Sequence, residues 1–265
     1  MQERPSWVST NGDDERPNVA RLFDYYLGGA HNFAVDREFA RASIEIFAVD
    51  EAARTTRSFL RRAVRLCVNA GVRQFLDLGS GIPTAGNVHE VALRLDPTCR
   101  VVYVDNEPVT VAHSRTMLRD HSSAAIVHAD VRDPDAVLNA PDAARLLDLD
   151  EPIAVLMVGV LPYLTDHDRP ADVVAKYREA MAPGSHLVLS HLTADEEPDL
   201  MGKLAELARL TNVTLLPRGK AEIADLLSGF DLVEPGLVLA GHWRDDADDT
   251  SPASSLSYGA VGVKR

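Results

Sequence analysis

The chain has 265 residues, 46% of them hydrophobic, and a formal net charge of −13 at pH 7. Such a chain can bury a large core, in one large domain or two small ones, and we expect one because its strands alternate with helices without a break. The acidic excess argues against nucleic acid as the main partner, since nonspecific affinity for phosphates rests on clustered Lys and Arg.

No targeting segment is indicated, because Met1 to Pro5 is followed by polar residues instead of an apolar stretch. The longest apolar run, 153–161, is too short to cross a bilayer. The two cysteines, Cys67 and Cys99, fit reduced, buried thiols. We therefore expect a cytoplasmic protein with no membrane partner.

The N-terminal quarter is predicted to be helical. Residues 1–16 are polar and predict a flexible tail. Asn18 is a plausible N-cap for a helix with an apolar stripe that ends at Gly28-Gly29, and further helices are predicted over 36–47 and 51–69. The arginines of the last helix are interpreted as a solvated face; they are Arg54, Arg57, Arg61, Arg62 and Arg65. The loop from Gly28 to Asn32 could fold over a crevice at the strand ends.

The stretch 74–84 organises the rest of the chain. Its apolar run predicts a buried strand, Gly79-Ser80-Gly81 predicts a tight turn, and apolar residues at helical spacing follow over 88–95. In open α/β sheets, this unit forms one side of a ligand crevice at the carboxyl ends of the strands. The next strand, 100–104, ends on Asp105, whose carboxylate can accept two hydrogen bonds from a ribose diol. Dinucleotide enzymes use the same acidic position, but Thr84 stands where their pattern requires a third glycine.

Three more strands are predicted, over 125–128, 153–158 and 185–190. The first ends at Asp130, which could accept an adenine amine while Val131 packs on the ring, or could cap the turn toward Asp133. Gly159 follows the second strand and would let a ligand approach closely. Residues 134–147 are predicted to be helical, as is the segment from 194 to about 229, which makes up most of an insertion at 191–229.

Two final strands, 230–238 and 257–263, have no helix pattern between them and should be antiparallel. The fold class is therefore α/β, with a seven-stranded, mostly parallel sheet, an antiparallel last strand and helices on both faces. This order of elements resembles the Rossmann-like fold of class I S-adenosylmethionine-dependent methyltransferases.

Several segments together resemble an actinobacterial family of S-adenosyl methyltransferases that was formerly a domain of unknown function. They include Pro17-Asn18-Val19-Ala20-Arg21, Asp77-Leu78-Gly79-Ser80-Gly81-Ile82-Pro83-Thr84, Val102-Tyr103-Val104-Asp105-Asn106 and Val233-Glu234-Pro235-Gly236. The resemblance covers nearly the whole chain. It implies one methyltransferase domain over 17–265, divided into a helical cap at 17–72 and a Rossmann-like core at 73–265.

The resemblance also implies S-adenosyl-L-methionine as the cofactor. By position, its methionine end would be lined by Asp77, Gly79, Ser80 and Gly81, its ribose by Asp105 and Asn106, and its adenine by Asp130 and Val131, with Gly159 as the floor. The candidates for the closing segment are Arg21, Tyr26 and Asn32, with Arg21 pairing the cofactor carboxylate or facing solvent. The candidates for substrate contact are His31, Tyr163 and His191.

The leading hypothesis is a methyltransferase for a small-molecule acceptor, which the sequence does not name. Gly159-Val160-Leu161-Pro162-Tyr163 stands where enzymes that methylate base amines carry Asn-Pro-Pro-Tyr or Asp-Pro-Pro-Tyr, so such a reaction is disfavoured. The alternatives are a cofactor-binding regulator without an acceptor and, disfavoured by Thr84 and the antiparallel ending, a nicotinamide oxidoreductase. No metal site is predicted, because the acidic runs 195–197 and 245–249 are typical of solvated loops.

Overall fold

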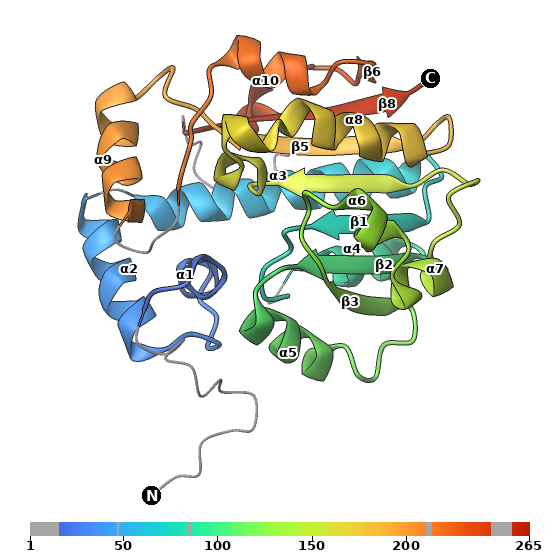
Figure 1. Ribbon diagram of the computed structural model, residues 1–265, viewed down its shortest axis with the longest axis horizontal. Coiled ribbons are helices and arrows are strands. Elements are labelled where there is room, and N and C mark those ends of the chain that lie inside the picture. Colours follow the sequence, from blue (N-terminus) through green and yellow to red (C-terminus); the bar gives the residue numbers. More distant parts are fainter. Residues whose placement is uncertain (1–15, 47, 84–85, 210–213, 245–255) are drawn as a thin grey trace, which may run out of the picture.

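A mixed β-sheet runs through the molecule between two layers of helices (Figure 1). The computed structural model describes residues 16–46, 48–83, 86–209, 214–244 and 256–265. The predicted tail lies outside the described residues, except for Arg16. Thr84 and the acidic run 245–249 also lie outside them. Among the described helices, none combines the length and the apolar character needed to cross a bilayer.

The sheet has eight strands in the order β3-β2-β1-β4-β5-β8-β6, with β7 paired to β8. The first five are parallel, and β8 is antiparallel to β5. This confirms the predicted class of fold. The strands are β1 (Gln74–Leu78), β2 (Arg100–Asp105), β3 (Ala124–His128), β4 (Ala154–Val158), β5 (His186–Leu192), β6 (Phe230–Leu232), β7 (Val238–Leu239) and β8 (Ser257–Lys264).

The prediction of one strand over 230–238 is wrong, because the structure divides this segment into β6 and β7. Between them the chain turns: the amide of Gly236 donates to the carbonyl of Val233 at 2.9 Å, and Gly236 has φ +82°. Pro235 has no N–H for a sheet ladder. The sheet therefore has one strand more than the seven expected.

The predicted helical segment 134–147 is also divided, since the chain is extended at Ala140, before Pro141. The helices are α1 (Val19–Tyr26), α2 (Ala34–Ile46), α3 (Val49–Asn69), α4 (Val88–Leu95), α5 (Pro108–Met117), α6 (Pro134–Leu138), α7 (Pro141–Leu146), α8 (Pro170–Ala180), α9 (Pro198–Arg209) and α10 (Lys220–Leu226). Three short 3₁₀ turns are η1 (Leu161–Tyr163), η2 (Asp166–Asp168) and η3 (Ala240–His242).

Both faces of the sheet are buried. Helices α3, α4 and α5 pack on one face, and α6, α7, α8 and α10 pack on the other. Along β4, Leu156 packs on the face covered by α3, α4 and α5, whereas Val155 and Met157 pack on the face covered by α6, α7, α8 and α10. This arrangement explains why the strand is apolar along its whole length.

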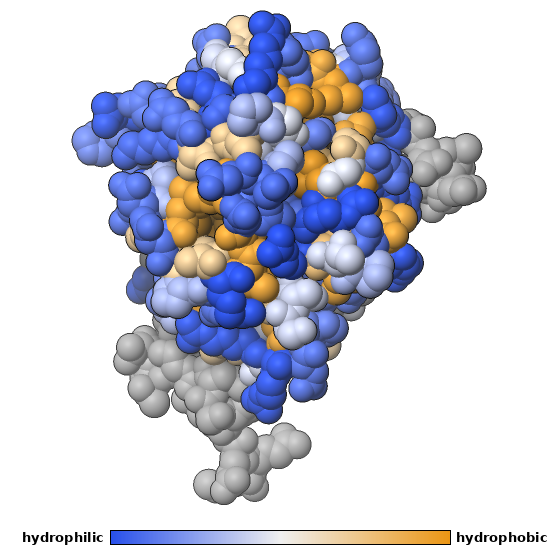
Figure 2. Space-filling view, turned by 90° about the vertical axis from the view of Figure 1, so that its right-hand side faces the viewer, coloured by the Kyte–Doolittle hydropathy of each residue, from blue (hydrophilic) through white to orange (hydrophobic). Residues whose placement is uncertain are grey.

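Helices α1, α2 and α9 form a third group at the carboxyl ends of the parallel strands (Figure 1). Asn18 is the N-cap of α1, as predicted: its Oδ1 accepts from the amides of Ala20 at 2.9 Å and Arg21 at 3.3 Å. The buried ion pair between Arg21 and Asp36 then joins α1 to α2. The end of the molecule away from this group carries hydrophilic and hydrophobic residues side by side (Figure 2).

The interpretation of the α3 arginines as a solvated face is wrong for Arg62, which is buried. Its guanidinium donates to the carbonyl oxygens of Trp243 and Ala240, at 2.8 Å each. Arg57 is half-buried and reaches the cavity described below. The helix is covered on more sides than its sequence indicates, because the segment around η3 packs against it.

Candidate functional site

A cavity of about 400 Å³ lies at the carboxyl ends of the strands, and residues of α1 line it. This volume is within the usual range for ligand sites. The cavity is lined from the ends of β1, β2, β3 and β4, and β1 lies between β2 and β4 in the sheet. It therefore occupies the point where the strand order reverses, which is where open α/β sheets bind ligands.

The glycine turn after β1 forms one wall of this cavity. The amides of Gly79 and Ser80 donate to the carbonyl oxygen of Val104, at 2.9 and 3.0 Å. Gly79 has φ +67°, and a Cβ at this position would lie 2.3 Å from Cγ2 of Val160. Only glycine fits here, so the turn keeps its backbone open to a ligand.

The carboxylate of Asp105, at the end of β2, holds the glycine turn in place at Gly81. Its Oδ2 accepts from the amide of Gly81 at 2.9 Å, and its Oδ1 accepts from the amide of Glu107 at 3.0 Å. Burial raises the pKa of this carboxyl group, and these two N–H groups oppose the increase. Each oxygen keeps capacity for a further donor, such as a ribose hydroxyl.

Asp77 and Arg57 form a coupled pair of charges beside the turn. Burial raises the pKa of Asp77 to about 7; Arg57 opposes this increase and Asp105 adds to it. Burial lowers the pKa of Arg57, and the negative charge of Asp77 counteracts the decrease. Nη1 of Arg57 lies 3.4 Å from Oδ1 of Asn87. The helix α3 thus brings a cation to the wall of the cavity.

Asp130 follows β3 and is bound by Arg132. Nε and Nη2 of Arg132 donate to the two carboxylate oxygens, at 2.9 and 2.6 Å, and this pairing lowers the pKa of Asp130. The Arg132 backbone amide also donates to Oδ1 at 2.9 Å. The amide of Asp133 donates to the carbonyl of Asp130 at 3.0 Å, so the side chain of Asp130 caps the turn toward Asp133 while still lining the cavity.

Asp24, on α1, is a lining residue that the sequence analysis missed. Its carboxylate is 2% exposed; Oδ2 accepts from the amide of His31 at 2.7 Å and from Nδ2 of Asn32 at 2.8 Å. Oδ1 accepts no hydrogen bond among the described residues, and Nδ1 of His31 lies 3.9 Å from it. A Cβ at position 29 would lie 2.0 Å from this oxygen, so Gly29 makes room for it. Asp24 thus adds a buried carboxylate to the wall of the cavity.

Ten of the predicted site residues line this cavity: Asp77, Gly79, Ser80, Gly81, Asp105, Asn106, Asp130, Val131, Gly159 and Tyr163. Tyr26 lines a neighbouring cavity that also touches Tyr163. His31 and Asn32 lie behind the lining residue Asp24. The backbone amide of His31 and Nδ2 of Asn32 donate to the carboxylate of Asp24. These placements leave the cofactor role of each residue a prediction.

The structure does not bring Arg21 or His191 to the cavity lining. Arg21 is 1% exposed, and its Nη2 donates to the carbonyl of Arg16 at 2.7 Å while Nε pairs with Asp36. Burial lowers the pKa of His191 to about 4. The neutral ring lies 2.8 Å (Nδ1) from the carbonyl of Leu192 and 3.0 Å (Nε2) from Nη1 of Arg218. Both residues therefore hold structure around the site.

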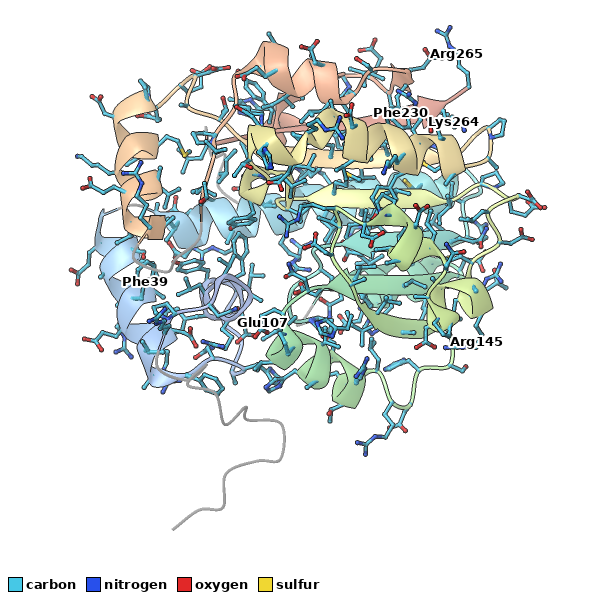
Figure 3. All side chains as sticks on the ribbon, viewed as in Figure 1. Phe39, Glu107, Arg145, Phe230, Lys264 and Arg265 are labelled. Atoms are coloured by element: carbon cyan, nitrogen blue, oxygen red, sulfur yellow. The ribbon has the colours of Figure 1, made fainter. Side chains whose placement is uncertain are left out.

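The charges that line the cavity are predominantly negative. Figure 3 shows Glu107 at the beginning of α5, at the end of the sheet near α1, with Arg145 and Lys264 at the opposite end. The acidic lining residues are Asp24, Asp77, Asp105, Glu107 and Asp130, and the basic ones are Arg57 and Arg132. Such a lining favours a ligand that carries positive charge.

Comparison with known proteins places the chain among close relatives. The family model described as S-adenosyl methyltransferase matches residues 5–265. A solved protein of Thermobifida fusca YX, assigned to the methyltransferases, is 38% identical with a TM-score of 0.90, over 98% of this chain and 100% of that one. A DUF574 family protein of Streptomyces avermitilis MA-4680 is 35% identical with a TM-score of 0.90, over 96% and 99%. No curated protein matches the chain.

Proposed function

Because this chain belongs to the S-adenosyl methyltransferase family, for which S-adenosylmethionine is the methyl donor, we propose that it methylates a small-molecule acceptor. Membership confirms the resemblance drawn from the glycine turn, the β2 end and the N-terminal segment. Nothing in the comparisons supports a nicotinamide oxidoreductase or a regulator without an acceptor.

The observation that carries the proposal is the negative lining of the cavity. S-adenosylmethionine has two positive groups, the sulfonium and the ammonium, against one carboxylate. Five acidic and two basic side chains line the cavity. Even with Asp77, whose pKa is about 7, half protonated at neutral pH, the acids outnumber the basic groups, so the electrostatic potential favours such a cation. The negatively charged pyrophosphate of a dinucleotide would be repelled by the same lining.

Individual roles follow from the charge and position of each residue. We assign the ribose hydroxyls to Asp105, whose oxygens keep accepting capacity, and the adenine to Val131 with the Asp130–Arg132 pair. The half-buried guanidinium of Arg57 suits the methionine carboxylate. Asp77 and Oδ1 of Asp24 suit the ammonium and the sulfonium. The volume of about 400 Å³ supports a ligand of this size.

The reaction asks the protein mainly to position and to exclude water. When bound, the cofactor would supply an activated methyl carbon for transfer to the lone pair of the acceptor, with its sulfur as the leaving group. Phe23 and Val19 of α1 close the cavity above the strand ends. The glycine turn holds its backbone amides in place through Val104 and Asp105.

Isothermal titration calorimetry with S-adenosylmethionine, S-adenosylhomocysteine and NAD tests the cofactor specificity on which this proposal depends. We expect the first two to bind and NAD to bind at least about 10-fold more weakly, and Asp105→Asn to weaken binding of the first two by about 10- to 100-fold. Asp120→Asn, at an exposed position outside the cavity, should leave binding unchanged. Tighter binding of NAD, or no binding of either sulfur ligand, would overturn the proposal.

A further inference from the structure

A second cavity, of about 120 Å³, adjoins the first. We call it the side cavity, and we call the larger cavity at the strand ends the cofactor cavity. Both cavities are lined by Val19, Phe23, Ala53, Thr56, Gly159 and Tyr163. The side cavity therefore begins where the cofactor cavity ends, at a wall that α1, α3 and the segment after β4 provide.

The side cavity is apolar. Its walls come from α1, α2, α3, α9 and the end of β5, and none of the described residues that line it has a charged side chain. The cofactor cavity differs, because seven of its lining side chains are acidic or basic. A charged group would lose its hydration here without gaining a partner, so the side cavity selects against ions.

Four aromatic side chains line the side cavity: Phe23, Tyr26, Phe39 and Tyr163. Phe23 and Tyr26 are in edge contact, with ring centroids 6.1 Å apart, and Phe39 comes from α2 at the same end of the molecule (Figure 3). An apolar cavity of roughly 150 Å³ holds benzene. A cavity of about 120 Å³ with aromatic walls therefore matches one ring.

Hydroxyl groups supply the polar contacts of the side cavity. Tyr26 is hydrogen-bonded to Ser43, whose Oγ donates to the carbonyl of Phe39 at 2.8 Å. Burial raises the pKa of both Tyr26 and Tyr163, so both phenols stay protonated at neutral pH. Tyr163 lines both cavities and can donate to an uncharged oxygen or nitrogen at their boundary.

Gly159 keeps the boundary open. It lines both cavities with φ +76°, and no atom lies within 4 Å of the position that a Cβ would take. A side chain at this position would enter free space between the two cavities. A group bound in the side cavity can therefore approach a ligand bound in the cofactor cavity.

We propose that the side cavity binds the methyl acceptor, and that this acceptor is an uncharged small molecule with one aromatic ring next to its nucleophilic atom. The proposal rests on the proposed function, since it needs a methyl donor in the adjoining cavity. It narrows the acceptor class by excluding carboxylate, phosphate and ammonium groups from the part that enters the side cavity.

The test uses the full chain with saturating S-adenosylhomocysteine and measures saturation-transfer NMR with phenol, benzoate and benzylammonium at neutral pH. Phenol should bind, and both charged probes should bind at least about 10-fold more weakly, because the side cavity offers neither charge a partner. The cationic probe separates this effect from the overall negative charge of the protein. Equal binding of all three probes, or no phenol binding, would overturn the proposal.

Variants locate the bound phenol. Ala52→Phe on α3 and Leu207→Trp on α9 add atoms to the wall of the side cavity at positions outside the cofactor cavity. Each should reduce phenol binding at least about 10-fold while leaving the Kd for S-adenosylhomocysteine within twofold. Ala171→Phe, at an exposed position on α8, is the matched control and should bind phenol normally. Should circular dichroism show one variant to be unfolded, the other carries the test.

The two proposals fail differently. Normal binding of S-adenosylhomocysteine with unchanged phenol binding in the folded variants would overturn the acceptor site and leave the cofactor site standing. Absence of S-adenosylhomocysteine binding in the wild type would overturn the proposed function, and the acceptor proposal with it.

Discussion

Nε of Arg21 lies 2.6 Å from Oδ2 of Asp36, and both side chains are almost completely buried. The same carboxylate accepts from the amides of Asn18 at 2.9 Å and Phe33 at 2.8 Å. Asp36 thus gathers the beginning of α1, the beginning of α2 and a buried cation. This carboxylate therefore joins α1, which lines both cavities, to α2, which lines the side cavity.

Asp36→Ala should lower the free energy of unfolding by about 3 to 5 kcal/mol, because it removes the carboxylate that lies 2.6 Å from a buried guanidinium. Urea denaturation measures the change. The matched control is Asp50→Ala, which removes the exposed pair with Arg54 on α3 and should cost less than about 1 kcal/mol. Equal losses in the two variants would contradict the role given to Asp36.

Gly79→Ala should be destabilised more than Gly71→Ala, although both positions have positive φ. At Gly71, with φ +94°, a Cβ meets nothing within 4 Å, so the substitution costs only backbone strain of about 1 to 2 kcal/mol. At Gly79 the Cβ also meets Val160 at 2.3 Å, which adds roughly 1 to 3 kcal/mol. Thermal and urea unfolding of both variants checks the difference; equal stability would mean that the turn adjusts freely.

Asp77→Asn should change how stability depends on pH. The folded pKa of about 7 lies above the ordinary value of 3.8, so between pH 4 and 7 the folded state binds more protons than the unfolded state. Stability contributed by Asp77 is complete at low pH and falls as pH rises through this window, by up to about 1.4 kcal/mol per pH unit. The wild type should therefore lose stability relative to Asp77→Asn between pH 4 and 7 and run parallel to it above.

Urea midpoints of both proteins across this pH range measure the effect, with the variant serving as the reference for every other titrating group. A constant difference between the two proteins would show that Asp77 titrates at an ordinary pKa in the folded state.

Arg57→Met should weaken binding of S-adenosylhomocysteine by about 10- to 100-fold, since we assign the methionine carboxylate to this guanidinium. Arg54→Met, one turn earlier on α3 and exposed, is the control and should bind normally. Calorimetry checks both. Normal affinity in folded Arg57→Met would show that another donor, such as Arg132, binds the methionine carboxylate.

The sequence predicts the strand-end residues well because their positions follow from local rules. A buried strand, a glycine turn and a following helix identify Asp77, Gly79 and Gly81, and Asp105 and Asp130 end the next two strands. Parallel strands bring their carboxyl ends to one edge, and the structure places all five residues at the cavity. The positions of these residues in the sequence are therefore sufficient to predict that they lie close together.

The helical residues could not be placed in the same way. Arg57 and Arg62 share a basic stripe with exposed Arg54, and only the packing of other segments on α3 separates the three. Asp24 looks like an ordinary polar residue on a short helix until the chain folds back and Asn32 donates to it. Long-range contacts, absent from any local pattern, decide which of these side chains reach the site.

The place of β8 in the sheet has a consequence for biosynthesis. β8 lies between β5 and β6, and in the described sheet β6 pairs with β8 alone. On the ribosome, β6 is made first and waits without a partner, while β5 keeps an unpaired edge until residues 257–264 emerge. Unpaired edges attract other chains. A nascent chain stalled before β8 therefore presents two unpaired strand edges, at β5 and β6, to other chains and to chaperones.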